Sequence, residues 1–207
     1  MRPVVDWPSF PRSPYNRPPT RPPLQVTPMA LKATVYKAEL QVSDIDRGYY
    51  GSHALTLARH PSETEERLMI RLLAFAMHAG ADLEFGRGLS TDDEPDLWQK
   101  DPTGEIQHWI DLGLPDERRL RKASGRARAL TLITYGQRSL DVWWPKNAGA
   151  LARLPTLTVW SLPDEAVAVL ASLAARNMAV QFTRQDGQMS VGDAKCYFEL
   201  AAERLQG

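Results

Sequence analysis

Apolar residues follow two different periods along the chain. In residues 32–44 and 49–60 apolar and polar residues alternate, and this period of two predicts a β-hairpin near the N-terminus. In residues 62–80 apolar residues recur at intervals of three and four, which predicts a buried helix that begins after Pro61 and stops at Gly80. The chain therefore belongs to a mixed α/β class.

The same reading continues to the end of the chain. We expect strands at 82–89, 95–100, 106–113 and 128–136, with a helix at 115–127 before the last of them. Further on we expect a strand at 157–162, a helix at 163–177 and a terminal hairpin at 179–191. That hairpin turns on Asp186 and Gly187, a pair that strongly favours a two-residue turn.

Residues 1–28 differ from the rest of the chain. They hold nine of the 16 prolines and a single acid, Asp6. Proline cannot donate to a sheet or continue a helix, so we expect this leader to be disordered or polyproline II. Met29 then opens a regular pattern, and we interpret it as the natural start. This gives one domain at 29–207, with a core at about 60–136.

Composition narrows the class of protein without naming a function. Lysine plus arginine balances aspartate plus glutamate at 25 each, so no overall basic field indicates a nucleic-acid partner. The single cysteine, Cys196, excludes internal disulfides and a thiolate zinc cluster, and it is compatible with a cytoplasmic protein. No apolar run has the length needed to cross a bilayer, so we expect no membrane partner.

Two acids stand in neighbouring predicted strands. Asp96 begins the strand at 95–100 and Asp111 lies near the end of the strand at 106–113, so paired strands would bring both to one end of the sheet. Two adjacent carboxylates repel unless a cation lies between them, and oxygen ligands suit Mg²⁺ or Mn²⁺. The alternative is that each acid simply faces water.

A third acid and a group of basic residues complete the candidate site. Glu66 lies where the apolar stripe of the first helix begins, although it would also stabilise the positive end of that helix. The basic residues occupy the helix at 115–127 and the start of the next strand: Arg118, Arg119, Arg121, Lys122, Arg126 and Arg128. They would bind phosphate or, equally, form a solvated face.

The sequence also resembles a known family. The segments that carry the resemblance are "MALKATVYKAEL", "LTLARHPSETEER", "DDEPDLW", "WIDLGLPDERRLRKA" and "DVWW". They are similar to the YaeQ family of bacterial proteins, and the similarity runs from Met29 to the C-terminus. The family resembles restriction-endonuclease-like enzymes in fold, which implies an α-β-β-β-α-β core with an added N-terminal β-hairpin and a C-terminal αββ extension.

The resemblance also implies roles for individual residues. Pro95, Asp96 and the acid of the next strand resemble the PD-(D/E)XK nuclease motif. On that pattern Glu66 is the helix acid, and Asp96 and Asp111 hold the metal. The motif then fails, because Gly113 stands where its lysine belongs. Lys122 is the first candidate to replace that lysine.

Other side chains would complete substrate binding. Arg119 is the second candidate for the missing lysine and, with Arg126 and Gln107, a candidate to bind substrate. Trp143 and Trp144, which we place on a strand, would divide between its two faces, so that one is available to stack on a base.

Two functions remain open at this point. The first is a nuclease or phosphodiesterase that depends on Mg²⁺ or Mn²⁺, in which a metal-bound water attacks phosphorus. The second is an inactive protein of the same fold that binds nucleic acid or a protein partner. The lysine missing at position 113 favours the second function, and three convergent acids would favour the first.

Overall fold

A computed structural model describes residues 33–87 and 93–207, all within one compact unit, Lys32–Gly207. The predictions for the leader at 1–28 and for residues 88–89 lie outside the described residues. The helices are α1 (Glu65–His78), α2 (Glu117–Ser124), α3 (Gln137–Leu151) and α4 (Asp164–Ser172). The strands are β1 (Thr34–Asp44), β2 (Tyr49–Arg59), β3 (Leu83–Phe85), β4 (Leu97–Lys100), β5 (Ile106–Leu112), β6 (Ala127–Tyr135), β7 (Leu157–Leu162), β8 (Asn177–Gln185), β9 (Gln188–Gly192), β10 (Tyr197–Leu200) and β11 (Glu203–Gln206).

The strands form two mixed sheets in the described part of the chain. The five-stranded sheet has the order β10-β9-β8-β1-β2, and the six-stranded sheet has the order β11-β7-β6-β5-β4-β3. In the first sheet only β1 and β8 are parallel. In the second, β5, β6 and β7 are parallel, and their neighbours run antiparallel. Parallel strands need long crossovers, and α2 and α3 supply them here.

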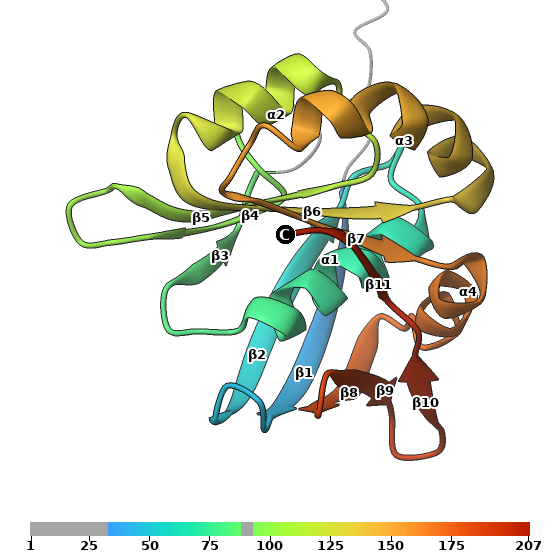
Figure 1. Cartoon of the computed structure of the whole chain (residues 1–207). Coiled ribbons are helices and arrows are strands. Elements are labelled where there is room, and N and C mark those ends of the chain that lie inside the picture. Colours follow the sequence, from blue (N-terminus) through green and yellow to red (C-terminus); the bar gives the residue numbers. More distant parts are fainter. Residues whose placement is uncertain (1–32, 88–92) are drawn as a thin grey trace, which may run out of the picture. The chain divides into compact units, whose positions relative to one another are not determined.

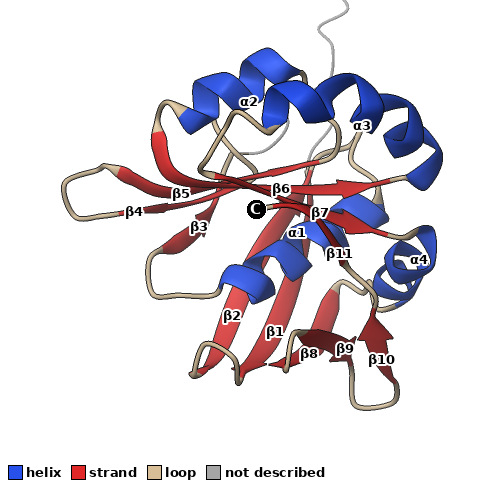
Figure 2. Cartoon of the chain, viewed as in Figure 1, coloured by secondary structure: helices blue, strands red, loops and turns tan. Residues whose placement is uncertain are grey.

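The sheets and helices are stacked in layers (Figures 1 and 2). Helices α2 and α3 cover one face of the six-stranded sheet, where Trp109, Leu120 and Leu151 belong to one apolar core. Helices α1 and α4 lie between the two sheets, and a second, larger core surrounds α1. Because α1 is enclosed on both sides, every residue from 68 to 77 is buried, including the charged Arg71.

The order of elements from α1 to β6 is the one predicted from sequence: helix, three strands, helix, strand. The predicted hairpins are also confirmed. Strands β1 and β2 pair antiparallel in an unbroken register, and β8 turns into β9 between Gln185 and Gln188. The alternation in β1 results from its position, since its even-numbered side chains face α1 and are largely buried.

One local prediction was wrong. Trp143 and Trp144 lie on helix α3 and not on a strand. The two buried residues of α3, Leu140 and Leu151, are eleven positions apart, which is three helical turns. The aromatic run between them suggested a strand, but its side chains pack on the six-stranded sheet with helical spacing. Among the described residues, none of the helices has the length and apolar character required to span a bilayer.

Candidate functional site

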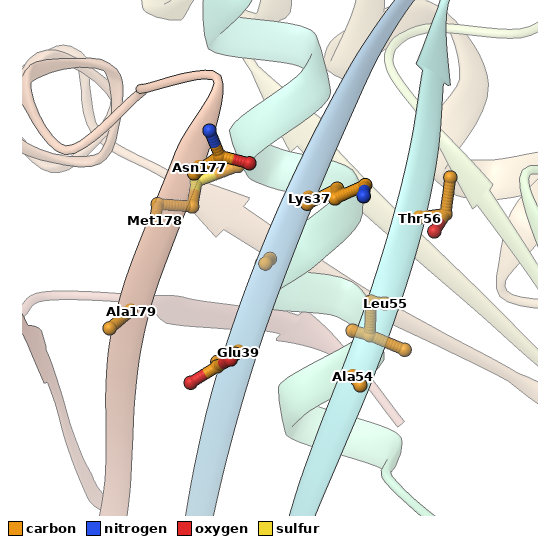
Figure 3. Close-up of a pocket in the computed structure, with 9 residues that line it drawn as sticks. Lys37, Glu39, Ala54, Leu55, Thr56, Asn177, Met178 and Ala179 are labelled. Atoms are coloured by element: carbon orange, nitrogen blue, oxygen red, sulfur yellow. The ribbon is translucent and has the colours of Figure 1, made fainter.

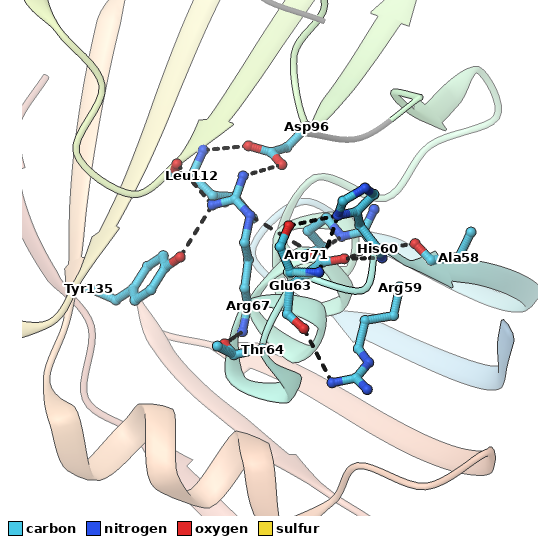
Figure 4. Close-up of polar contacts among 11 residues, drawn as sticks. Ala58, Arg59, His60, Glu63, Thr64, Arg67, Arg71, Asp96, Leu112 and Tyr135 are labelled. Carbon is cyan, nitrogen blue, oxygen red and sulfur yellow. Dashed lines mark hydrogen bonds and ion pairs between the residues drawn. The ribbon is translucent and has the colours of Figure 1, made fainter. Parts of the chain in front are cut away.

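The candidate site lies where α1 begins and β5 ends (Figure 4). Thr64 is the N-cap of α1 and accepts a hydrogen bond from the Arg67 amide at 3.3 Å. The chain just before this cap turns Glu63 into the protein, where only 5% of the residue is exposed. Glu63 Oε1 lies 2.9 Å from Arg71 Nε, and Arg71 Nη2 also donates to the carbonyl of Ala58. A buried cation of α1 is thus neutralised by the acid that precedes the helix.

Arg67 connects this pair to Asp96. Its Nη2 lies 2.6 Å from Asp96 Oδ1, and its Nη1 donates to the Leu112 carbonyl at 3.3 Å and to the Tyr135 hydroxyl at 3.2 Å. Asp96 Oδ2 accepts the Leu112 amide at 2.9 Å. Both oxygens of the Asp96 carboxylate are therefore engaged, and Figure 4 shows them facing Arg67 and the end of β5.

Burial and a neighbouring negative charge disfavour the ionised form of Asp96. Burial raises the pKa of its carboxyl above the ordinary value, and the Arg67 guanidinium offsets part of that rise. The negative charge of Asp111 raises the pKa of Asp96 further, so the two carboxylates are close enough to interact.

Asp111 faces the opposite layer. It is 1% exposed, and its two oxygens accept from Arg119 of α2, from Nη2 at 2.8 Å and from Nε at 2.9 Å. This two-point contact is the strong geometry for an arginine and a carboxylate. Arg119 Nη2 also donates to the carbonyl of Glu94, just before β4. Asp96 and Asp111 are thus each paired with an arginine, Arg67 of α1 and Arg119 of α2.

Gly113 stands where the resemblance to the nuclease motif would place a lysine. Its backbone φ of +92° is a left-handed conformation that residues other than glycine rarely adopt. A Cβ placed there would lie 3.6 Å from Arg67 Nη1. The cation nearest this position is therefore a guanidinium from α1. An arginine keeps its proton at physiological pH, so Arg67 cannot act as a base.

The other predicted residues lie apart from this pair of aspartates. Glu66 is exposed, and hydrogen bonds from the Thr64 side chain and from its own amide lower the pKa of its carboxyl. Gln107 donates to Asp101 Oδ2 at 2.8 Å, and Asp101 lies in the turn between β4 and β5. The structure therefore does not bring Glu66 or Gln107 to Asp96.

The remaining basic residues point to the surface of the α2 layer. Lys122 forms an ion pair with the Asp93 side chain. Arg126 Nη1 donates to the backbone carbonyl of Asp93 at 3.2 Å. The Arg126 guanidinium also lies 5.3 Å from the centre of the Trp109 ring. Lys122 thus lies outside the contacts of Asp96 and Asp111. Of the two predicted lysine substitutes, Arg119 alone contacts one of these two aspartates.

The donor set can be tested against a divalent cation. Mg²⁺ needs several oxygen ligands and tolerates no cations at the same distance. All four oxygens of Asp96 and Asp111 already accept hydrogen bonds, and three of those four contacts come from guanidinium groups. Within residues 33–87 and 93–207, no group of three or more His, Cys, Asp or Glu residues could hold a metal ion. The side chains as arranged do not fit the metal.

Sequence reasoning missed the residues that dominate the buried part of the site. Glu63, Arg67, Arg71 and Tyr135 were not among the predicted site residues. One signal was available: Arg71 interrupts the apolar stripe of a helix predicted to be buried. A buried arginine requires a carboxylate partner, and Glu63 lies two turns before it.

Together, the fold and the site define an α/β protein with two mixed sheets and a pair of arginine-bound aspartates. Comparison with known proteins places it further. The family model described as YaeQ protein matches residues 29–202, and the chain belongs to the YaeQ family.

Relatives and solved structures agree with that assignment. The YaeQ proteins of Escherichia coli strain K12 and Salmonella typhi, each described as uncharacterized, are 46% identical over 172 residues, which cover 83% of this chain and 95% of each relative. The crystal structure of YaeQ from Xanthomonas axonopodis pv. citri matches with a TM-score of 0.81 and 51% identity, covering 84% of this chain and 98% of that one. YaeQ from Pseudomonas syringae also gives 0.81, at 40% identity, with 84% and 97% covered.

Proposed function

We propose that this YaeQ-family protein has a restriction-endonuclease-like core and binds nucleic acid without hydrolysing it. The observation that carries the proposal is the pairing of Asp96 with Arg67 and of Asp111 with Arg119. In a metal-dependent nuclease those carboxylates hold the cation that activates water. Here two guanidinium groups take the place of that cation.

Two further features support the absence of hydrolysis. Gly113 has no side chain to orient water or to stabilise the charge that develops on phosphorus. Arg67, which lies beside it, holds its proton and is fixed by contacts with Asp96 and Tyr135. Binding of Mg²⁺ would have to displace two arginines from short contacts, and each displaced guanidinium would then lack its buried acid.

The α2 layer supplies the expected binding surface. Residues 116–128 hold six basic and two acidic residues. Three of the exposed basic residues form ion pairs: Arg121 with Glu117, Lys122 with Asp93, and Arg128 with Glu105. Exposed ion pairs contribute only about 0–1 kcal/mol each. A phosphate group could therefore replace the acid partner at little cost, which favours nucleic acid over a protein partner.

The test is binding and cleavage measured on the same samples. We expect fluorescence anisotropy to detect binding of labelled DNA or RNA oligonucleotides, equally with Mg²⁺ and with EDTA. Affinity should fall steeply with added salt, because bound phosphates release counterions. No cleavage product should form with Mg²⁺ or Mn²⁺.

A matched pair of variants locates the surface. Arg121→Glu/Lys122→Glu reverses two charges on α2 and should abolish most of the binding. Arg138→Glu/Lys146→Glu makes the same change at exposed positions of α3, in the same layer, and should retain most of it. Equal losses in both variants, or no binding at low salt, would overturn the proposed surface. Cleavage that requires metal and disappears in Asp111→Asn would overturn the absence of hydrolysis.

A further inference from the structure

The two sheets have four edge strands, and one of them is unlike the others. Edge strands β3, β10 and β11 have three or four residues each, and each carries a charged residue: Glu84, Glu199 and, in β11, Glu203 and Arg204. Strand β11 also has an irregular register at Arg204. Short length, charge and irregularity are the usual means by which proteins keep sheet edges from pairing.

Strand β2 has none of these protections. It is 11 residues long, pairs with β1 without a bulge, and contains no charged residue or proline from Tyr49 to Ala58. An exposed edge of this length presents a row of backbone groups that can pair with another strand. In the described part of the chain β2 has β1 as its only strand neighbour.

Hydrogen bonds elsewhere in the sheet identify which backbone groups of β2 face outwards. The amides of Lys37 in β1 and of Ile45 just after it donate at 2.8 Å each, to the carbonyls of Arg176 just before β8 and of Arg184 in β8. The odd-numbered residues of β1 therefore bond to β8, and the even-numbered residues bond to β2. Through the observed register, odd-numbered residues of β2 receive those bonds. The amides and carbonyls that point away from the sheet belong to Tyr50, Ser52, Ala54, Thr56 and Ala58.

The face of the sheet beside this edge is open. Figure 3 shows β8, β1 and β2 with side chains that stand on the outer face, among them Lys37, Ala54 and Ala179. They line an open depression of about 480 Å³, which small side chains leave unfilled. All five outward-bonding residues of β2 have exposed side chains, and Tyr50 is 67% exposed.

We propose that β2 pairs antiparallel with β2 of a second copy of this chain, across a two-fold axis at Ala54. This register sets Ala54 against Ala54, Ser52 against Thr56, and Tyr50 against Ala58. All five outward-facing residues then find partners, which makes about ten backbone hydrogen bonds. The two five-stranded sheets become one continuous sheet.

The charge pattern favours a second copy over other occupants. A two-fold axis sets each side chain near its own counterpart, so a charge close to the axis would face the same charge. The outward-facing positions of β2 carry no charge, and their small side chains fit against themselves. At the end of the strand, Arg59 would oppose the Tyr49 ring of the second copy, a favourable cation–π arrangement.

The pairing also accounts for two exposed apolar side chains. Val35 of β1 is 49% exposed and lies beside Ala58 in the register of the hairpin. Tyr50 of the second copy would lie on the other side of Ala58, on the same face of the sheet. Its ring could cover Ala58 and reach Val35, which removes both apolar groups from water.

Molar mass and amide exchange of the full chain test the proposal. We expect light scattering after size exclusion to give twice the chain mass at high concentration and a fall towards one chain on dilution. Hydrogen exchange should show protected amides at Ser52, Ala54 and Thr56 in the dimer, and loss of that protection on dilution. A monomer at all concentrations would overturn the proposal, and so would protection that does not depend on concentration.

Three variants make the test specific. Ala54→Lys brings two ammonium groups together at the axis and should give a monomer. Thr56→Pro removes an amide that β1 does not use, so the fold is retained and dimerisation should weaken at least tenfold. Gln181→Lys adds the same charge to the same face, two strands from the edge, and should leave the dimer intact. A dimer that survives Ala54→Lys would show that the interface lies elsewhere.

Discussion

Ion pairs between acidic and basic side chains occur on both sides of the six-stranded sheet, in different surroundings. On the α1 side, the side chains of Glu63 and Arg71 are 3% and 5% exposed. On the α2 side, Lys122 and Asp93 are 56% and 71% exposed. The difference teaches that residue type alone does not separate a structural charge from one available to a ligand, and that burial does.

Solvation explains this difference. A charge taken out of water must be matched by a partner, and removal of one member of a buried pair costs about 3–5 kcal/mol. Water solvates both members of an exposed pair, so the pair contributes little and its members can exchange partners. We therefore assign the buried Glu63–Arg71 pair to holding the fold together and the exposed pairs of α2 to binding.

The largest effect should follow from breaking the buried pair. Glu63→Gln leaves Arg71 enclosed without its carboxylate, and we expect a loss of about 3–5 kcal/mol in the free energy of unfolding. Urea denaturation of wild type and variant measures this. Glu66→Gln makes the same change three positions later at an exposed site and should alter stability by less than about 0.5 kcal/mol. Equal effects of the two variants would remove the distinction between buried and exposed acids.

Acid should reveal the same intolerance of buried charge. His78 of α1 and His108 of β5 pack edge to face, with 4.7 Å between the centres of their rings. Burial lowers the pKa of His108 from 6.5 to about 4, with a further contribution from Arg47, and it lowers that of His78 well below 6.5. Both imidazoles are neutral in the folded protein at neutral pH.

The sign of the pH dependence follows from that depression. Between pH 6.5 and 4 the unfolded chain binds a proton at His108 that the folded protein does not, so stability falls as pH falls through this window. We expect His108 alone to contribute a loss of about 3 kcal/mol by pH 4. Denaturation midpoints measured across this range should fall less steeply in His108→Gln. An unchanged slope in that variant would contradict the assignment.

The smallest effect on stability should come from the α2 surface. Lys122→Gln removes one member of an exposed pair and should change the free energy of unfolding by less than about 1 kcal/mol. The variant should change nucleic-acid affinity more clearly than it changes stability. If Lys122 contacts a phosphate, the slope of log affinity against log salt should fall by about one. A large loss of stability in this variant would show that the α2 pairs are structural as well.

The sequence predicted the elements better than the polar contacts. Periodicity located α1, the two hairpins and the order of elements up to β6, because each of these has one continuous apolar face. Periodicity failed at α3, where the run with Trp143 and Trp144 was predicted to be a strand and is a helix. The identity of sheet neighbours distant in sequence, such as β1 and β8, had no local signal.

The candidate site shows the same limit. The sequence identified Asp96, Asp111 and Arg119, and of these Arg119 and Asp111 are in contact. It placed Glu66 with them because helical spacing alone was considered. The turn before Thr64 buries Glu63 instead, and periodicity does not register where a chain turns before a helix. The partner of each aspartate depends on the packing of α1 and α2 against the sheet.

Thermal unfolding of Asp111→Asn, with and without Mg²⁺, tests the central claim most directly. If Arg119 neutralises Asp111, the variant loses a charged partner of a nearly buried pair and should be less stable by about 2 kcal/mol. Mg²⁺ should then leave the Tm of both proteins unchanged. If the carboxylates instead hold a metal, Mg²⁺ should raise the Tm of wild type and not that of the variant. The metal-free variant should then be at least as stable as wild type, because repulsion from Asp96 is relieved.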